Sequence, residues 1–362
     1  MLREIERDEL EPLATGAWIL GAGGGGSPYL SYLNARNLYQ QGKRVNLMDP
    51  RGLDDDDLVA VVSNMGAPLV GQERLSDPAF SAKPLRMMED YLGRKFRAVM
   101  SVEIGGGNAF QSLLVSAVTG LPMVDADAMG RAFPEAQMTS FAIAGLPMFP
   151  LTLADIRDNE VIVARAASWK WMERISRKAC TEVGSIAATC KAPRSGREVK
   201  EHGILDTTTK AIRIGRVVRE ARRRHEDPVA ALLEAESGVL VFKGKIHDLQ
   251  RRATEGFLRG KAQVEGLGED RGSTFELEFQ NEFAAGWRDG EVVVTTPDII
   301  CVMDSVSGEA IGTESIRYGQ RVSVVALPSP DQLLTPQGLD HVGPRAFGYD
   351  FDYKTVFQAV KA

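Results

Sequence analysis

A run of glycines, GAGGGGSP, lies between two predicted helices near the start of the chain. Its letters fit the dinucleotide-binding pattern Gly21-x-Gly23-x-x-Gly26, and Asp49 follows at the distance where that pattern has an acid. A glycine-rich loop before a helix also presents unpaired N–H groups and the positive end of the helix dipole, which suit an anion or a polar carbonyl. The glycines expected to contact a substrate are Gly23, Gly24, Gly25 and Gly26.

Three features of this run argue against a dinucleotide. The only candidate for the preceding strand is residues 17–20, which continue a helical pattern. Four consecutive glycines match many spacings by chance, and Ser27-Pro28 is an ordinary helix start, with a cap and a proline at the first position. We therefore expect no flavin or NAD. A purely structural turn is the alternative to a ligand loop.

A carboxylate and three glycines follow a predicted strand in Glu103-Ile-Gly-Gly-Gly-Asn108. In open α/β sheets the carboxyl ends of the strands line the ligand crevice. Glycines beside a carboxylate let the backbone approach a ligand, so Glu103 is a candidate general base, with Gly106 and Asn108 as substrate contacts. The alternative makes Glu103 a cap partner of the following helix.

A third group of charged residues follows the next predicted strand. Asp125, Asp127 and Glu135 can bind a divalent cation through oxygen ligands, or they can supply an acid/base pair. In the second case Asp127 is the candidate base, and Asp125 and Glu135 are expected substrate contacts. Arg131 is a further substrate contact, or it neutralises the acids in a structural cluster. A metal therefore stays possible, and its ligands stay unassigned.

The sequence motifs typical of zinc sites, serine hydrolases and P-loop nucleotide-binding proteins are missing. The three cysteines show no CxxC spacing and the four histidines form no HxH or HxxxH pair, so zinc is poorly supported. Neither a GxSxG elbow nor a GxxxxGK[ST] loop is present. The net charge of −6 argues against nucleic acid and membrane partners. The odd cysteine count and the charged first residues lead us to expect a cytoplasmic protein.

The first half of the chain alternates short apolar runs with helical patterns. We expect a helix over 1–20 that can turn into a short strand at 17–20, and further helices over 28–41, 83–94 and 108–119. Strands are expected at 45–48, 58–63, 96–102 and 122–124. This alternation predicts an α/β domain over 1–165, Rossmann-like and three-layered, with a mostly parallel sheet.

The second half changes character. Helices are expected at 169–179 and 207–224, and the second of these is strongly basic, which is typical of a solvated or subunit-interface helix. From residue 238 onward, runs such as STFELEFQNEF and QRVSVVALP alternate with turn sequences such as Asp289-Gly290. Residues 166–362 are therefore predicted to form an α+β, β-rich domain.

Taken in order, several of these segments resemble the S-methyl thiohydantoin desulfurase family. The segments are GAGGGGSPYL, EIGGGNA, GLPMVDADAMGRAFPEAQM, FKGKI, QNEF, PDIICVMD, IRYGQRVSVVALP and GPRAFGYD. The resemblance covers roughly residues 10–355 and implies an N-terminal α/β domain and a β-rich C-terminal domain. The activity it implies is replacement of the methylthio group of an S-methyl thiohydantoin by oxygen, and it implies association with hydantoinase or oxoprolinase-type enzymes.

The implied reaction suits the residues. A carboxylate, Glu103 or Asp127, would activate water, and the amides of 23–26 would stabilise developing negative charge. A bound metal is the alternative activator. The competing classes are a non-catalytic protein that binds a small metabolite and an oxidoreductase that uses a nucleotide cofactor. We also expect a homo-oligomer, because the apolar, Met-rich stretch 133–149 is predicted to form an exposed surface.

Overall fold

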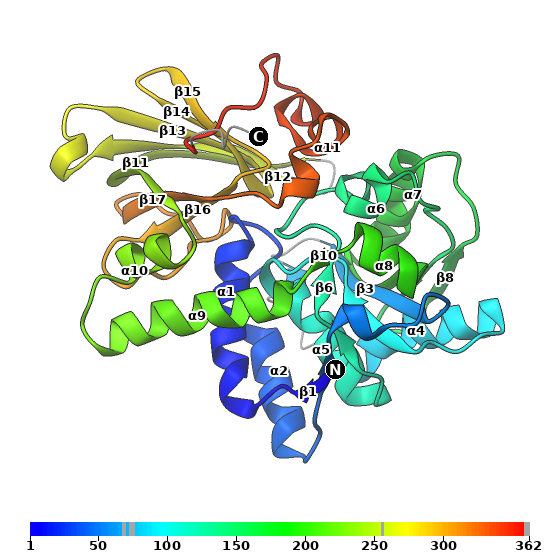
Figure 1. The fold of residues 1–362 in the computed structure, drawn as a ribbon. Coiled ribbons are helices and arrows are strands. Elements are labelled where there is room, and N and C mark those ends of the chain that lie inside the picture. The colour runs from blue at the N-terminus through cyan, green and yellow to red at the C-terminus, as the bar shows by residue number, and fades with distance from the viewer. Residues whose placement is uncertain (67–69, 72–76, 255–256, 358–362) are drawn as a thin grey trace.

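The computed structural model describes residues 1–66, 70–71, 77–254 and 257–357, and it contains two large sheets joined by helices (Figure 1). The first sheet has the strand order β1-β2-β5-β4-β3-β9-β7-β8. Its strands are β1 (Leu2–Glu4), β2 (Asn46–Met48), β3 (Leu58–Gly66), β4 (Ala98–Ser101), β5 (Met123–Val124), β7 (Leu151–Ala154), β8 (Glu160–Val163) and β9 (Ile186–Ser195). The neighbours β2-β5-β4-β3 are parallel, which confirms the predicted α/β core, and the outer pairings are antiparallel.

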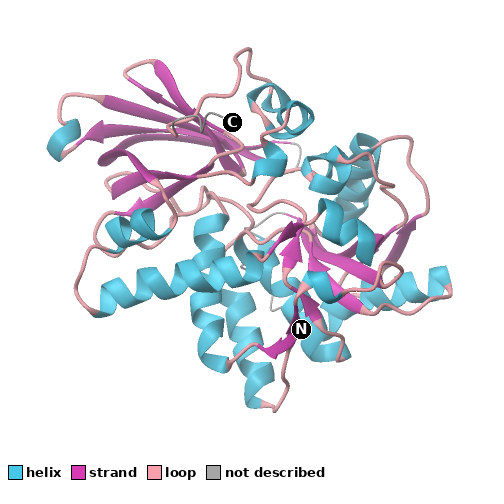
Figure 2. Ribbon diagram, in the orientation of Figure 1, coloured by secondary structure: helices cyan, strands magenta, loops and turns pink. Residues whose placement is uncertain are grey.

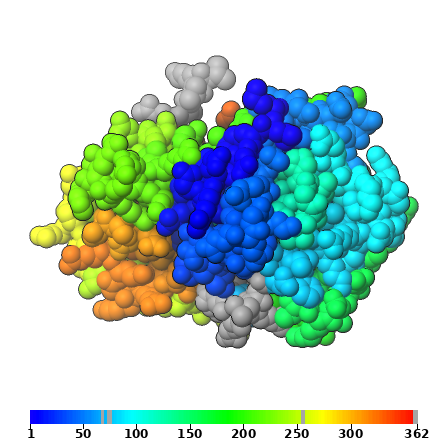
Figure 3. All heavy atoms as spheres, turned by 90° about the horizontal axis from the view of Figure 1, so that it is seen from below, coloured from blue at the N-terminus to red at the C-terminus, as the bar shows by residue number. Residues whose placement is uncertain are grey.

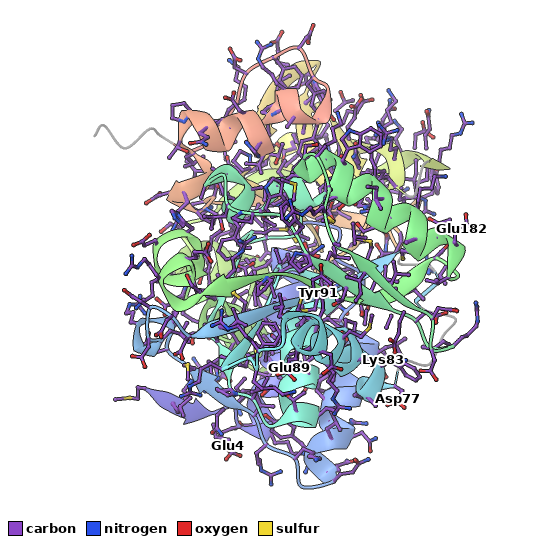
Figure 4. The ribbon with its side chains drawn as sticks, turned by 90° about the vertical axis from the view of Figure 1, so that its right-hand side faces the viewer. Glu4, Asp77, Lys83, Glu89, Tyr91 and Glu182 are labelled. Carbon is purple, nitrogen blue, oxygen red and sulfur yellow. The ribbon has the colours of Figure 1, made fainter. Side chains whose placement is uncertain are left out.

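Helices cover both faces of this sheet, as the alternation of helix and strand patterns predicts (Figure 2). Ala60 and Val62 of β3 pack toward α4 and α5, whereas Val61 and Met65 pack toward α8 and α7. Figure 4 shows α7, which ends at Glu182, and α4, which carries Lys83 and Glu89, on opposite sides of the strands. The helices are α1 (Leu10–Leu20), α2 (Tyr29–Gln40), α4 (Pro78–Leu92), α5 (Gln111–Thr119), α6 (Ser140–Ile143), α7 (Trp169–Glu182), α8 (Gly196–His202), α9 (Thr207–Arg223), α10 (Pro228–Ala235) and α11 (Pro336–Val342).

The second sheet is antiparallel throughout and has the order β15-β14-β13-β12-β11-β17-β16. Its strands are β11 (Val239–Thr254), β12 (Phe257–Gly266), β13 (Thr274–Gln280), β14 (Glu282–Arg288), β15 (Glu291–Thr295), β16 (Ile299–Asp304) and β17 (Arg321–Leu327). The predicted turn at Asp289-Gly290 joins β14 to β15, and both residues have positive φ, as a tight hairpin turn requires. The β-rich second half is thus confirmed.

The N-terminal segment differs from its prediction. Residues 2–4 form β1 against β2, and the α-helix starts only at Leu10. The strand suggested for 17–20 is wrong, because these residues complete α1, where Leu13, Ala17 and Leu20 recur at helical spacing and are buried. The glycine run therefore follows a helix and lacks the strand that a dinucleotide loop requires. Farther along, β9 pairs with β3, so the first sheet extends past residue 165.

One core joins the two halves. Leu13 and Ala17 of α1 belong to the same apolar cluster as Ile212 of α9 and Val325 of β17. On the outside, the basic residues of α9 meet acids of the N-terminal segment, as in the 2.8 Å contact of Arg216 with Glu9. The N-terminal helices lie between the two sheets on the underside of the molecule (Figure 3). The chain is therefore one packed body, not two loosely linked domains.

The glycine loop is held by backbone contacts on two sides. Gly107 N–H donates to the carbonyl oxygens of Gly25 and Gly26 at 3.0 and 2.9 Å. A Cβ on Gly25 would lie 2.5 Å from the Gly105 oxygen, so no side chain fits there. On the other side, Phe283 N–H of β14 donates to the Ala22 oxygen at 2.8 Å. Close approach of three backbones therefore explains the glycines without invoking a nucleotide.

Gly25→Ala should destabilise the protein far more than Gly93→Ala. Both glycines have left-handed φ, +71° and +64°, so each substitution carries the same backbone strain of about 1 kcal/mol. Gly93 has open space around its Cβ position, whereas Gly25 does not, and we expect an additional ~3 kcal/mol of destabilisation for Gly25→Ala. Urea unfolding of both variants measures the difference; equal losses would contradict the close-approach argument.

Candidate active site

A cavity of about 480 Å³ lies at the carboxyl ends of the parallel strands β3 and β4. Open α/β sheets place ligands at this edge. The walls come from the glycine loop, the ends of the two strands, β9, α7 and the β13–β14 turn of the second sheet. Its polar lining residues include Asn64, Glu103, Asn108, Glu135, Glu173, Arg177, Lys191, Asn281 and Glu282. The two halves of the chain therefore build this site together.

Glu103 is positioned by donors on both carboxylate oxygens. Asn108 Nδ2 donates to Oε1 at 2.5 Å, and the Phe133 N–H donates to Oε2 at 3.1 Å. The Asn108 amide is itself fixed, because its oxygen accepts from the Asn64 N–H at 2.8 Å. Only 6% of Glu103 is exposed, and this burial raises its pKa to about 7 despite the two hydrogen bonds. Its proton can thus move near neutral pH.

Glu282 is the second buried carboxyl group of the cavity. It begins β14, directly after Asn281, which has a left-handed φ of +60°. A Cβ on Gly24 would lie 2.0 Å from Glu282 Oε1, so the glycine leaves the space that this carboxyl group fills. Oε2 is buried without a hydrogen-bond partner. Burial and the neighbouring Glu103 charge raise the pKa of Glu282 well above its usual range.

The two cations of the cavity have different surroundings. Arg177 of α7 donates from Nε to Glu173 Oε1 at 2.7 Å and from Nη2 to the Pro134 oxygen at 3.1 Å. Lys191 of β9 lies on the same side of the sheet, and its ammonium makes no ion pair or hydrogen bond with the residues that the structure describes. Burial lowers the pKa of Lys191, against the opposing effect of Glu173 and Glu103.

The structure brings together part of the set proposed from the sequence. The residues of that set that line the cavity are Gly25, Gly26, Glu103, Asn108 and Glu135. Those that do not line it are Gly23, Gly24, Gly106, Asp125, Asp127 and Arg131. The three segments that carry them still meet, because the Ile104 N–H donates to Asp127 Oδ2 at 2.7 Å and the Ala132 N–H to the Leu20 oxygen at 3.1 Å.

The two aspartates proposed from the sequence bind backbone instead of the cavity. Asp125 Oδ1 accepts from the Thr208 and Thr209 N–H groups at 2.8 and 3.1 Å, at the start of α9. Asp127 is fully buried and accepts from Ile104 and Gly130 N–H groups. Both carboxylates thus satisfy orphan donors of loops and a helix start, and neither can reach water in the cavity.

Arg131 has a comparable structural role. It is fully buried, its guanidinium donates to the carbonyl oxygens of Ala132, Asp298 and Phe283, and it stacks over the Phe133 ring. It therefore links the loop after β6 (Ala126–Asp127) to the second sheet and acts on the cavity only through its charge. Charge near buried carboxyl groups lowers their pKa, which partly offsets their burial.

Sequence reasoning missed Glu282, Lys191, Glu173 and Arg177. Glu282 stands inside QNEF, one of the segments that carried the family resemblance, and it is a charged residue at the start of a strand whose next residues are apolar. Lys191 likewise follows the small apolar run IAATC of β9. A charge that interrupts a buried strand is the available signal, since such a group is costly unless a partner or ligand meets it.

Three further points from the sequence concern an oligomer surface, a metal ion and a membrane. In the apolar stretch 133–149, Phe133, Phe141 and Ile143 are buried inside the chain, whereas Gly145 and Pro147 are exposed. The expected apolar surface is thus smaller than predicted, and the homo-oligomer stays a prediction. Among the described residues, no group of three His, Cys, Asp or Glu side chains is arranged to hold a metal ion. Nor does any described helix have the length and apolar character needed to cross a membrane.

Fold and site together define an α/β protein with a cavity of mixed polar and apolar lining that a second, antiparallel sheet completes. The chain belongs to the S-Me-THD-like family: the model of its N-terminal domain matches residues 8–165 and that of its C-terminal domain matches residues 167–356. This confirms the resemblance to S-methyl thiohydantoin desulfurases seen in the sequence motifs.

A crystal structure of a protein from Chromobacterium violaceum is similar over almost the whole length. It shares 24% sequence identity and a TM-score of 0.79, and the match covers 97% of this chain and 99% of that chain. At this identity the likeness establishes a shared fold. No curated protein sequence matches the chain.

Glu103→Gln should change how stability depends on pH. The folded chain keeps the Glu103 proton up to about pH 7, whereas the unfolded chain loses it near pH 4.5, so the free energy of unfolding falls as pH rises across this interval. Glutamine lacks this titration. We expect the stability of the wild type relative to the variant to fall by about 3 kcal/mol from pH 4.5 to pH 7.5.

Urea unfolding at the two pH values measures this change. The exposed residue Glu182 supplies the control, Glu182→Gln, which should track the wild type. Parallel curves for the wild type and Glu103→Gln would show that burial does not hold a proton on Glu103.

Proposed function

We propose that this protein is a hydrolase that replaces the methylthio group of an S-methyl thiohydantoin, or a closely related cyclic thioimidate, by oxygen from water. The observation that carries the proposal is the pair Glu103 and Glu282, two buried carboxyl groups with raised pKa that line one cavity. Family membership supports the substrate class.

The different surroundings of the two groups suit different roles. Glu103 is held by two donors and titrates near neutral pH, so its carboxylate can take a proton from water. Glu282 has an unpartnered oxygen, and burial and the neighbouring Glu103 charge raise its pKa well above its usual range, so in its protonated form it can donate to the ring nitrogen. Environments that push the pKa values of two acids apart commonly assign acid and base roles in enzymes.

The resulting reaction balances. Water adds to the ring carbon of the C=N bond while Glu103 removes one proton from water and Glu282 protonates the nitrogen. The tetrahedral intermediate carries a hydroxyl and a methylthio group on the same carbon. Return of the hydroxyl proton to Glu282 forms C=O and breaks the C–S bond. The products of this step are a hydantoin and methanethiolate. The thiolate takes up one proton to become methanethiol, and this balances the proton that Glu103 removed from water.

The direct test supplies an S-methyl thiohydantoin to the purified protein and follows methanethiol in the headspace and hydantoin by mass spectrometry. We expect both products in a 1:1 ratio, with oxygen from ¹⁸O-labelled water in the ring carbonyl. Binding in a thermal-shift assay without turnover would favour a metabolite-binding protein instead. Failure to bind or convert any member of the class would overturn the proposal.

Glu103→Gln and Asp127→Asn separate a base from a structural carboxylate. Glu103→Gln should lower kcat by about 10²–10⁴ and abolish a rise in kcat/KM with an apparent pKa of about 7, because only the carboxylate accepts a proton from water. Asp127→Asn should leave kcat within about tenfold but lower the melting temperature, because the amide meets the Ile104 and Gly130 N–H donors. The reverse pattern would assign the base role to Asp127.

A further inference from the structure

Lys191 is a charged lining residue of the cavity for which neither the fold nor the roles above account. It lies on β9 opposite Val61 of β3, on the face of the sheet that α7 covers. The charged groups that face it are Glu173 and Arg177 from α7 and Glu103 from the end of β4. It is only partly exposed and lines the cavity.

The neighbouring cation shows what a structural role looks like here. Arg177 is bonded to Glu173 and to the Pro134 oxygen, and its guanidinium lies over the Phe257 ring at 4.5 Å. The second oxygen of Glu173 accepts from the Ala136 N–H at 3.2 Å, so Glu173 is also satisfied within the protein. Within the described residues the Lys191 ammonium has no such partner. Because Lys191 lines the cavity and is only partly exposed, a ligand in the cavity is the partner that its ammonium can meet.

We propose that Lys191 delivers the proton to the departing methanethiolate. This inference rests on the proposed desulfurisation and adds the group that completes it. The geometry favours it, because Lys191, Glu103 and Glu282 enter the same cavity from different elements: β9, the end of β4 and the β13–β14 turn. A ring bound in the cavity can thus meet a base, a ring-nitrogen donor and a leaving-group donor that come from three different elements.

The proton transfers close the cycle. When the C–S bond breaks, its electron pair stays on sulfur, and the thiolate takes a proton from the Lys191 ammonium to leave as methanethiol. The neutral amine then takes the proton that Glu103 removed from water. Glu103 is again a carboxylate, Lys191 an ammonium and Glu282 an acid, and the net reaction consumes one water.

The chemistry of the leaving group explains why a lysine suits this position. Methanethiolate is a basic alkyl thiolate, so it leaves poorly without a proton. Burial lowers the pKa of the Lys191 ammonium from its ordinary value, which makes the proton easier to release. An arginine would hold its proton too tightly, because a guanidinium stays protonated in proteins.

The experiment compares two leaving groups in the wild type and in Lys191→Met. With the S-methyl substrate the variant should lose about 10²–10⁴ in kcat. With an S-(4-nitrophenyl) analogue, whose thiolate leaves without a proton, the loss should stay below about tenfold. Lys191→Arg keeps the charge but releases no proton, so it should be as slow as Lys191→Met on the S-methyl substrate.

The control is Lys95→Met, which removes a lysine whose side chain is 79% exposed and paired with Glu89 and should leave both rates unchanged. The melting temperature of Lys191→Met should equal or exceed that of the wild type, because no partner is lost. Equal losses with both leaving groups, or wild-type rates in Lys191→Arg, would overturn the proton-donor role. Absence of turnover by the wild type on both substrates would instead overturn the proposed function, and this inference with it.

Discussion

The contact among three backbones, at the glycine loop, the loop after β4 and the start of β14, is the constraint on which the site depends. Gly107 binds the carbonyl oxygens of Gly25 and Gly26, while Phe283 binds Ala22 from the other side. Thr313 adds an N–H and a hydroxyl donor to the Gly23 oxygen. Because these are backbone contacts at van der Waals limits, they fix where Glu103 and Glu282 lie relative to each other. Side chains far apart in the sequence thereby face one cavity.

This junction buries the carboxyl groups of Glu103 and Glu282, and burial of such groups is energetically costly. A carboxyl group moved out of water favours its protonated form, and Glu103 and Glu282 both show the resulting rise in pKa. The two groups are compensated differently: both oxygens of Glu103 accept a hydrogen bond, whereas backbone N–H groups and the Arg131 charge offset part of the burial of Glu282 but leave its Oε2 without a partner. Natural folds seldom retain an unsatisfied buried group without a functional reason. Lys191 and Arg177 differ in a similar way. Arg177 is bonded to Glu173 and to the Pro134 oxygen, whereas the Lys191 ammonium has no such partner among the described residues.

The sequence allowed much of the fold to be predicted, because apolar periodicity is a local property. The parallel strands, the helices between them and the antiparallel second half each follow from it. Apolar periodicity gave a wrong prediction at residues 17–20. A short apolar run there suits either a helix or a strand, and packing against α9 decides between them. The residues of the site could be predicted only in part. Glu103 is marked by its place after a strand, whereas Glu282 and Lys191 become neighbours of the cavity only through long-range contacts that no local pattern contains.

The glycine run shows why a pattern of letters needs its structural context. A nucleotide loop requires glycines so that a pyrophosphate can approach a helix start that follows a strand. Here the run follows α1, and the space that its missing side chains leave is taken by protein: the Gly105 oxygen beside Gly25, and the Glu282 carboxyl beside Gly24. The glycines thus shape the cavity by the space that they leave. They admit an acid from the second sheet into a cavity of the first, and a cyclic substrate with both donors and acceptors on its rim is the kind of ligand that such mixed walls can hold.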